Sequence, residues 1–223
     1  MKDKPLGRPA RPNAQQIRQA LENDIVDGRF APGEKLDPEA LAVEFSCSRT
    51  PIRDALQALE SSGLVRVEPK RGTFVTELSV VELTERFEVM AELEAMCARL
   101  AASRATDEQI ARIRTAQTAC ESAASTGDSD AYYHQNTVFH QAVYAASGNI
   151  FLEGEALRLQ TMLQPYRRRQ LQVRGRMNRS LDEHRQIMAA IEVGDTTGAS
   201  SAMNAHVIIQ GDRFHQLIAS LRP

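Results

Sequence analysis

The spacing of apolar side chains predicts three helices in the first quarter of the chain. One is expected over residues 13–28, where apolar residues recur at intervals of three and four. A second opens with Pro38 after the capping residue Asp37, since the missing N–H of proline costs nothing in a first turn. A third follows the capping residue Ser48 and ends at Gly63, with its apolar positions on one face.

After Gly63 the hydrophobic period changes from helical to alternating. The segments "LVRVEP" and "GTFVTEL" each alternate apolar and polar residues, as half-buried strands do. Between them lies "KRG", a turn whose glycine can adopt a positive φ, whereas the earlier "FAPGEKL" is predicted to be a plain turn. Three helices followed by a hairpin are the outline of a winged helix-turn-helix.

From Ser79 onward every pattern is helical. A long helix begins there, a second is capped by Thr106, and a third runs from 126–130 to 147–149. A fourth region starts at Ile150 and contains Pro165, which is expected to kink or split it. Two more helices are expected over residues 180–193 and 196–221.

These patterns predict a mainly α protein, an N-terminal winged helix-turn-helix followed by an all-α helical bundle. Cations and prolines with few apolar residues predict a flexible basic arm at the start of the chain. The expected divisions are the arm over 1–12, the winged helix-turn-helix over 13–78 and the bundle over 79–223.

Composition is that of an ordinary globular protein, with 42% apolar and 25% charged residues among 223. No run approaches the roughly 20 apolar residues of a membrane span, and the N-terminus lacks the apolar stretch of a secretory signal. Three widely spaced cysteines argue against a disulfide framework. We therefore expect a cytoplasmic protein without a membrane partner.

The net charge is only −2, so a local group of cations needs its own explanation. The second helix of a helix-turn-helix places its N-terminal residues against base edges in the major groove, and arginine matches the two acceptors of guanine. The wing would then reach the backbone or the minor groove. The expected DNA-binding residues are Ser48, Arg49, Thr50, Arg53, Lys70, Arg71 and Gly72.

The same stretch carries a family resemblance. "GRFAPGEKL…LAVEFSCSRTPIRDALQALESSGLVRVEPKRGTFV" closely resembles the DNA-binding domain of the GntR family of bacterial transcription regulators. The resemblance implies a homodimer on a pseudo-palindromic operator of double-stranded DNA, with Arg49 and Arg53 as contacts and Thr50 and Gly72 in support. Some members have a basic residue where this chain has Glu39, so that helix is expected to contribute less.

Three histidines of the second domain lie at apolar positions. His140 shares a helix face with Asn136, and His184 and His206 each have apolar neighbours at helical spacing. Taken singly, each is explained as a satisfied core residue. If they converge, neutral imidazoles and an oxygen ligand suit a zinc-, nickel- or manganese-like ion.

The motifs "N..FH…ASGN", "EHRQI..AI..GD" and "A…M..H" resemble the FCD-type ligand-binding domain of the FadR branch of this family. The resemblance implies a metal held by Asn136, His140, His184 and His206, beside a pocket for a small organic acid. Asn136 stands where aspartate is common, and Met90 where many members have arginine. Arg167, Arg168 and Arg169 are candidates to replace that cation, although a solvated basic run explains most of them, and Tyr133, Tyr144 and Tyr166 either line the pocket or pack in the core.

Three functions follow from these features. The first is a regulator, by family habit a repressor, that responds to a small carboxylate. The second is a metal-dependent enzyme using His140, His184 and His206, and the third a regulator whose second domain only dimerises. Glu183 is expected to point away from the face of His184, and no nucleophile elbow or phosphate loop is present. The sequence therefore favours a regulator without catalytic residues or organic cofactor.

Overall fold

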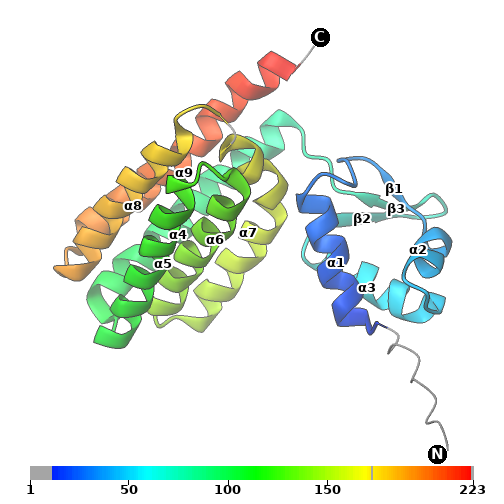
Figure 1. The fold of residues 1–223 in the computed structure, drawn as a ribbon, viewed down its shortest axis with the longest axis horizontal. Helices are drawn as coiled ribbons and strands as arrows, with labels where there is room; N and C mark the ends of the chain where they lie inside the picture. The colour runs from blue at the N-terminus through cyan, green and yellow to red at the C-terminus, as the bar shows by residue number, and fades with distance from the viewer. Residues whose placement is uncertain (1–11, 172, 222–223) are drawn as a thin grey trace, which may run out of the picture. The chain divides into compact units, whose positions relative to one another are not determined.

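The computed structural model describes residues 12–171 and 173–221, with side chains described as far as Ile208. The chain divides into two compact units between Glu77 and Leu78 (Figure 1). The predicted boundary lay between residues 78 and 79. The predicted basic arm, except for its last residue, lies outside the described residues.

The first unit packs three helices against a small sheet. Its elements are α1 (Ala14–Val26), β1 (Lys35–Leu36), α2 (Pro38–Glu44), α3 (Arg49–Ser61), β2 (Val65–Glu68) and β3 (Gly72–Val75). The sheet is antiparallel in the order β1-β3-β2, with Lys35 opposite Phe74. Strand β1 was not predicted, because two residues are too few to show an alternation. Strand β1 forms because β3 has a second edge, opposite the one that pairs with β2, along which β1 can pair.

Capping side chains mark where the helices of this unit begin. Asn13 and Gln16 form a reciprocal capping box at α1, and the Asp37 carboxylate accepts the Glu39 N–H as predicted. Ser48 occupies the N-cap position of α3, but its side chain makes no capping hydrogen bond. The fully buried core of the unit includes Ile17, Leu21, Leu36, Ile52 and Leu59.

The turn of the wing depends on a left-handed backbone. Lys70 and Gly72 have φ values of 65° and 117°. A Cβ on Gly72 would lie 2.9 Å from Lys35 Cε, so glycine lets β3 start close beside β1. The glycine predicted for this turn is therefore required by its φ, whereas the flexible Lys35 side chain has room to move away from a Cβ.

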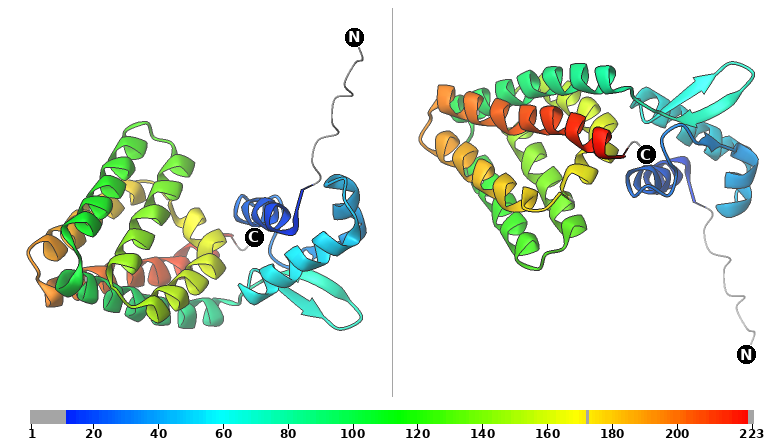
Figure 2. Two further views of the ribbon diagram at one scale, coloured as in Figure 1. Left: turned by 90° about the horizontal axis from the view of Figure 1, so that it is seen from below. Right: turned by 90° about the horizontal axis from the view of Figure 1, so that it is seen from above.

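The second unit is a bundle of helices. They are α4 (Val80–Arg104), α5 (Asp107–Ser125), α6 (Ser129–Ala146), α7 (Ile150–Leu171), α8 (Arg176–Glu192) and α9 (Thr196–Leu221). Helices α4 and α9 lie side by side along much of their length (Figure 2). In the sequence this bundle follows a winged helix-turn-helix, so the predicted fold class is confirmed.

Two details of the bundle differ from the prediction. Pro165 does not split α7, because Leu163 and Tyr166 on either side of it are both buried, and their packing outweighs one lost backbone hydrogen bond. Helix α8 begins at Arg176, earlier than expected, after Gly175 with a φ of 75°. Among the described residues, no helix is long and apolar enough to cross a bilayer.

Charged and polar side chains occupy the interior of the bundle. Each of the following is less than a tenth exposed: Glu94, Asn136, His140, Arg167, Arg176, Ser180, His184 and His206. Burying such groups costs free energy unless they are paired. Their concentration in one core therefore indicates a binding site.

Candidate DNA-binding surface and metal centre

Helix α3 divides its residues between the core and the surface. Ile52, Ala55, Leu56 and Leu59 are buried, which holds the opposite face outward. Arg49, Thr50 and Arg53 are exposed on that face, as is Ser48 before it. The structure thus presents the four predicted residues of the recognition helix to solvent.

Arg49 already has an acidic partner. Its Nη2 lies 2.9 Å from Glu39 Oε1 of α2, with the two side chains 60% and 66% exposed. A surface pair of this kind contributes about 0–1 kcal/mol. It is weak enough to open when a phosphate or base competes for the guanidinium.

The wing adds a second group of cations. Lys70 and Arg71 are exposed at its turn, and Arg71 forms an ion pair with Glu68. The guanidinium carbons of Arg66 and Arg71 lie 5.8 and 5.6 Å from the centre of the Phe74 ring, a cation–π arrangement that directs both along the wing. Arg66 was not singled out from the sequence, although its outward position in the alternating strand was a sufficient signal.

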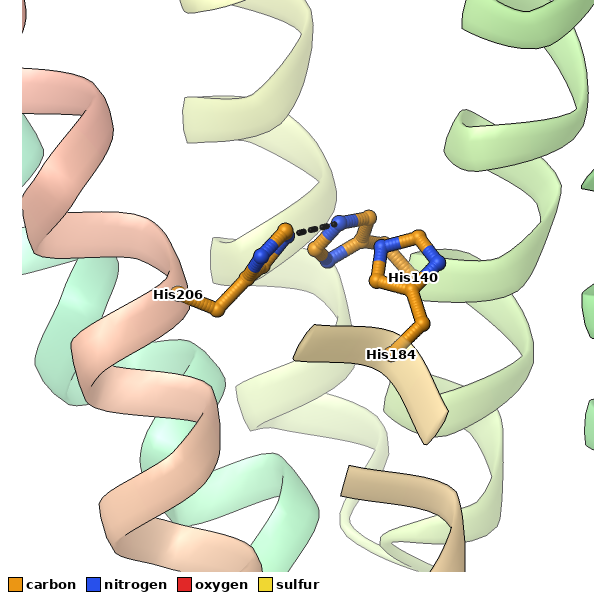
Figure 3. Close-up of side chains that lie close together, drawn as sticks. All are labelled: His140, His184 and His206. Atoms are coloured by element: carbon orange, nitrogen blue, oxygen red, sulfur yellow. Dashed lines mark hydrogen bonds between the residues drawn. The ribbon is translucent and has the colours of Figure 1, made fainter. Parts of the chain in front are cut away.

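Three histidines from different helices converge in the bundle. His140 of α6, His184 of α8 and His206 of α9 each place a ring nitrogen within 4.8 Å of the others (Figure 3). All three are fully buried. Sequence spacing put each on an apolar helix face, and the tertiary structure brings them to one point.

Carboxylates behind two of the rings determine which nitrogen carries the proton. His140 Nδ1 hydrogen-bonds to Glu94, and His206 Nδ1 lies 2.6 Å from Glu183 Oε2. A carboxylate accepts, so each Nδ1 donates and each Nε2 presents a lone pair. Carboxylates placed in this way are typical of histidines that bind metals through Nε2.

The two lone pairs face each other. His140 Nε2 and His206 Nε2 are 3.2 Å apart, and the His140 lone pair also accepts a hydrogen bond from Arg167 Nη2 at 3.0 Å, which a bound ion would replace. Two nitrogens bound to one tetrahedral zinc at 2.0–2.1 Å would stand about 3.3–3.4 Å apart, close to this distance. The spacing therefore fits a shared metal ion.

His184 supplies the third nitrogen. Neither of its ring nitrogens has a hydrogen-bond partner within the described part of the chain, although both are buried. The ring is held by stacking on Phe139, with centroids 4.0 Å apart. An unpaired buried polar group costs about 1–3 kcal/mol, which a bound ion would recover.

The electrostatics of the site keep the rings neutral. Burial lowers the pKa of His140, His184 and His206 well below the ordinary value, and the positive charge of Arg176 lowers each pKa further. Neutral imidazole is the form that binds zinc, nickel and manganese. Asn136 is buried on α6 one turn before His140. These residues fit a divalent ion.

A buried ion pair adjoins the histidines. Arg167 Nη1 donates to Glu94 Oε1 at 3.0 Å, and Arg167 Nη2 lies 3.0 Å from His140 Nε2. Glu94 is fully buried and was missed in the sequence. Its signal was a lone carboxylate on the apolar face of α4, four residues after Met90 and four before Ala98.

Glu183 corrects one expectation. It was expected to point away from the face of His184, yet it reaches His206 on the next helix and also accepts from Arg176 Nη1 at 2.7 Å. Reasoning from one helix could not foresee a contact to another. Glu183 therefore orients a histidine of the cluster.

The other three pocket candidates are also buried. Met90 is fully buried among the apolar residues of α4, and Tyr133 of α6 is 9% exposed. The Tyr166 hydroxyl accepts the backbone N–H of Leu78 at 3.0 Å, which gives it a structural role. Of the four predicted pocket residues, Arg167 hydrogen-bonds to His140, and Tyr133 interacts electrostatically with Arg167.

Comparisons with known proteins find a matching family for each of the two parts of the chain. Residues 13–75 match the bacterial regulatory proteins of the gntR family, and residues 85–208 match the FCD domain. The chain belongs to the GntR family, with an FCD domain. It is 31% identical to the HTH-type transcriptional repressor GlaR of Escherichia coli K12 over 84% of this chain and 89% of that one.

Two further matches each cover more than nine-tenths of the chain. The chain is 27% identical to the uncharacterized HTH-type transcriptional regulator YdhC of Bacillus subtilis, over 92% of each chain. The solved structure of McbR/YncC from E. coli shares the fold, with a TM-score of 0.78 over 94% of this chain and 98% of that one at 23% identity. These families and relatives are transcription regulators, so the protein is a regulator and not an enzyme.

Proposed function

We propose that this GntR-family regulator is a repressor that binds a pseudo-palindromic operator as a homodimer. The exposed Arg49, Thr50 and Arg53 of α3 would read base edges in the major groove, while the wing at Lys70 and Arg71 contacts the backbone. The repressor name of the relative from E. coli K12 supports the direction of control. Each subunit of the dimer would occupy one half-site.

The bundle is proposed to sense a small carboxylic acid held on a divalent ion. His140, His184 and His206 would hold the ion, with Asn136 as an oxygen ligand. The observation that carries this proposal is the pair of opposed Nε2 lone pairs 3.2 Å apart, beside a His184 without a partner among the described residues. The ion would act as a Lewis acid that binds an oxygen of the effector.

Arg167 supports an anionic effector. Its guanidinium lies 3.0 Å from His140 Nε2, at the edge of the proposed ion site. Arg167 Nη1 is held by Glu94, whereas its Nη2 donates to His140 Nε2 and would be released for an anion once an ion takes that nitrogen. A carboxylate oxygen would meet the ion and a second oxygen would accept from Arg167. Such binding has to change DNA affinity by only 1–3 kcal/mol to act as a switch, a range typical of allosteric coupling.

Native mass spectrometry of the full chain tests these proposals together. We expect a dimer with the added mass of a divalent ion. His184→Ala should abolish that mass, because it removes a ligand, whereas the matched control His134→Ala, at an exposed position on α6, should keep it. A monomer would contradict the homodimer. A bare dimer that also refuses added zinc, nickel and manganese would favour the alternative in which the second domain only dimerises.

A further inference from the structure

We infer, on the basis of the proposed metal site, that Tyr166 transmits occupancy of that site to the junction between the two units, residues 76–78. Tyr166 and Arg167 are neighbours on α7 and are bonded in different directions. Arg167 hydrogen-bonds to His140, and Tyr166 to the backbone where the second unit begins. Two consecutive residues thus join the histidines to the junction.

The junction between the units is short. The Thr76 N–H donates to the Leu64 carbonyl oxygen at 2.9 Å within the first unit, and the Leu78 N–H donates to Tyr166 Oη at 3.0 Å within the second. Glu77, which lies between them, is exposed. One residue therefore separates amides that are held in different units, so the hold on Leu78 fixes where the chain leaves the bundle.

The contact with the tyrosine lies immediately before α4. Ser79 caps that helix, and the Leu78 N–H reaches a hydroxyl 88 residues further along the chain. Leu78 and Tyr166 are both less than a tenth exposed. A buried N–H needs an acceptor, so when the Tyr166 hydroxyl moves, the Leu78 backbone has to follow it or lose the bond.

Arg167 ties the same turn of α7 to the proposed ion site. Its Nη1 donates to Glu94 Oε1 and its Nη2 to His140 Nε2, both at 3.0 Å. When His140 gives its Nε2 lone pair to an ion, Arg167 loses that acceptor and its guanidinium withdraws. Arg167 is 3% exposed in a close-packed interior, so the withdrawn group displaces the turn of helix that carries it.

Helix α7 lacks one backbone hydrogen bond just before these two residues. Pro165 has no N–H to donate to the carbonyl of Thr161, four residues earlier. A turn without this bond deforms at lower cost than an intact one. The turn that carries Arg167 therefore gives way first, and Tyr166 moves with it.

Occupancy of the ion site thus weakens the hydrogen bond between Leu78 and Tyr166 and releases the junction. Coupling of this kind is reciprocal, because an ion that weakens the bond is opposed by the bond to the same degree. Loss of the Tyr166 hydroxyl should therefore release the junction without an ion and also tighten ion binding.

Hydrogen exchange at the Leu78 amide of the full-length protein, measured by NMR with and without zinc, tests this coupling. In the wild type, zinc should accelerate exchange about two- to tenfold, the effect of one net hydrogen bond. In Tyr166→Phe, exchange should be fast in both states, and zinc should bind more tightly by about the same factor. A tyrosine with a purely structural role would leave the zinc affinity unchanged.

Two further variants serve as controls. Tyr132→Phe also removes a buried tyrosine hydroxyl, but from α6, where that hydroxyl interacts with Ser180, so it should keep the wild-type response at Leu78. His184→Ala lacks a proposed ligand, so zinc should no longer alter exchange at Leu78. The comparison of His184→Ala with the wild type does not depend on how well Tyr166→Phe folds.

The possible results separate this coupling from the metal site itself. Zinc binding to the wild type without a change at Leu78 would overturn the coupling and leave the metal site standing. Equal zinc affinity in the wild type and Tyr166→Phe would overturn it too, as would a response lost equally in Tyr132→Phe. If the wild type binds no zinc, the proposed metal site fails and the coupling fails with it.

Discussion

At the scale of single residues, charged partners decide what each functional side chain can do. Arg53 is exposed, and no ion pair is found for it within the described residues, whereas Arg49 is tied to Glu39 at 2.9 Å. The two arginines of one recognition helix therefore differ in how freely they meet DNA. Glu39 holds Arg49 in place, and it also repels phosphate.

Replacing Glu39 with Gln should tighten binding to DNA of any sequence. The change frees Arg49 for phosphate and removes one negative charge from the DNA-facing surface, so the affinity for a random-sequence duplex should rise several-fold, about 1 kcal/mol. Fluorescence anisotropy at moderate salt measures this. Glu60→Gln, at the other end of α3, is the matched control. Equal affinities in the two variants would show that Glu39 does not restrain Arg49.

At the scale of elements, helix α4 provides the buried carboxylate on which the polar core depends. Ser79 caps this helix through a capping box, and its apolar face packs into the bundle. Within that face, Glu94 contacts His140 and Arg167, which come from α6 and α7. One residue of α4 thus orients side chains on two other helices.

Replacing Glu94 with Gln should destabilise the bundle strongly. The change leaves the Arg167 guanidinium buried without its opposite charge, which costs about 3–5 kcal/mol. Urea unfolding followed by circular dichroism gives the loss in free energy of unfolding. Glu88→Gln, an exposed position on the same helix, should change it little. A loss of similar size in both variants would contradict the role assigned to the buried pair.

At the scale of the whole molecule, the chain places its exposed candidate DNA-binding cations and its buried histidine cluster in different units. The cations of α3 and the wing are exposed in the first unit, and the histidines are enclosed in the second. Overall the chain carries a net charge of −2, so attraction to DNA depends on where the cations lie. We expect the two units to respond differently to pH, because the buried histidines belong to the bundle.

Acidification should destabilise the metal-free bundle. Burial lowers the pKa of three histidines in the folded state, so the unfolded chain binds more protons once the pH falls below the ordinary histidine value of about 6.5. Stability is complete above that pH and falls below it, by up to about 1.4 kcal/mol per histidine and pH unit. Calorimetry of EDTA-treated protein at pH 7.5 and 5.5 measures the shift. A melting temperature that is the same at both values would refute it.

The sequence alone determined most of the secondary structure and the positions of the exposed cations. Local rules located the helices, the hairpin and the exposed cations, because capping, hydrophobic period and turn glycines act within a few residues. The same rules missed β1, which needs the edge of β3, and the continuity of α7 through Pro165, which needs packing on both sides of it.

The chemistry of the bundle was decided only by the tertiary structure. The spacing of Asn136 and His140 placed both on one face, but spacing could not bring His184 and His206 to the same point. The partners of the site come from helices far apart in the chain: Glu94 faces His140, Glu183 faces His206, and Arg167 lies beside both Glu94 and His140. Such contacts arise because buried charges must find partners, and only the packing of the helices determines which partners are within reach.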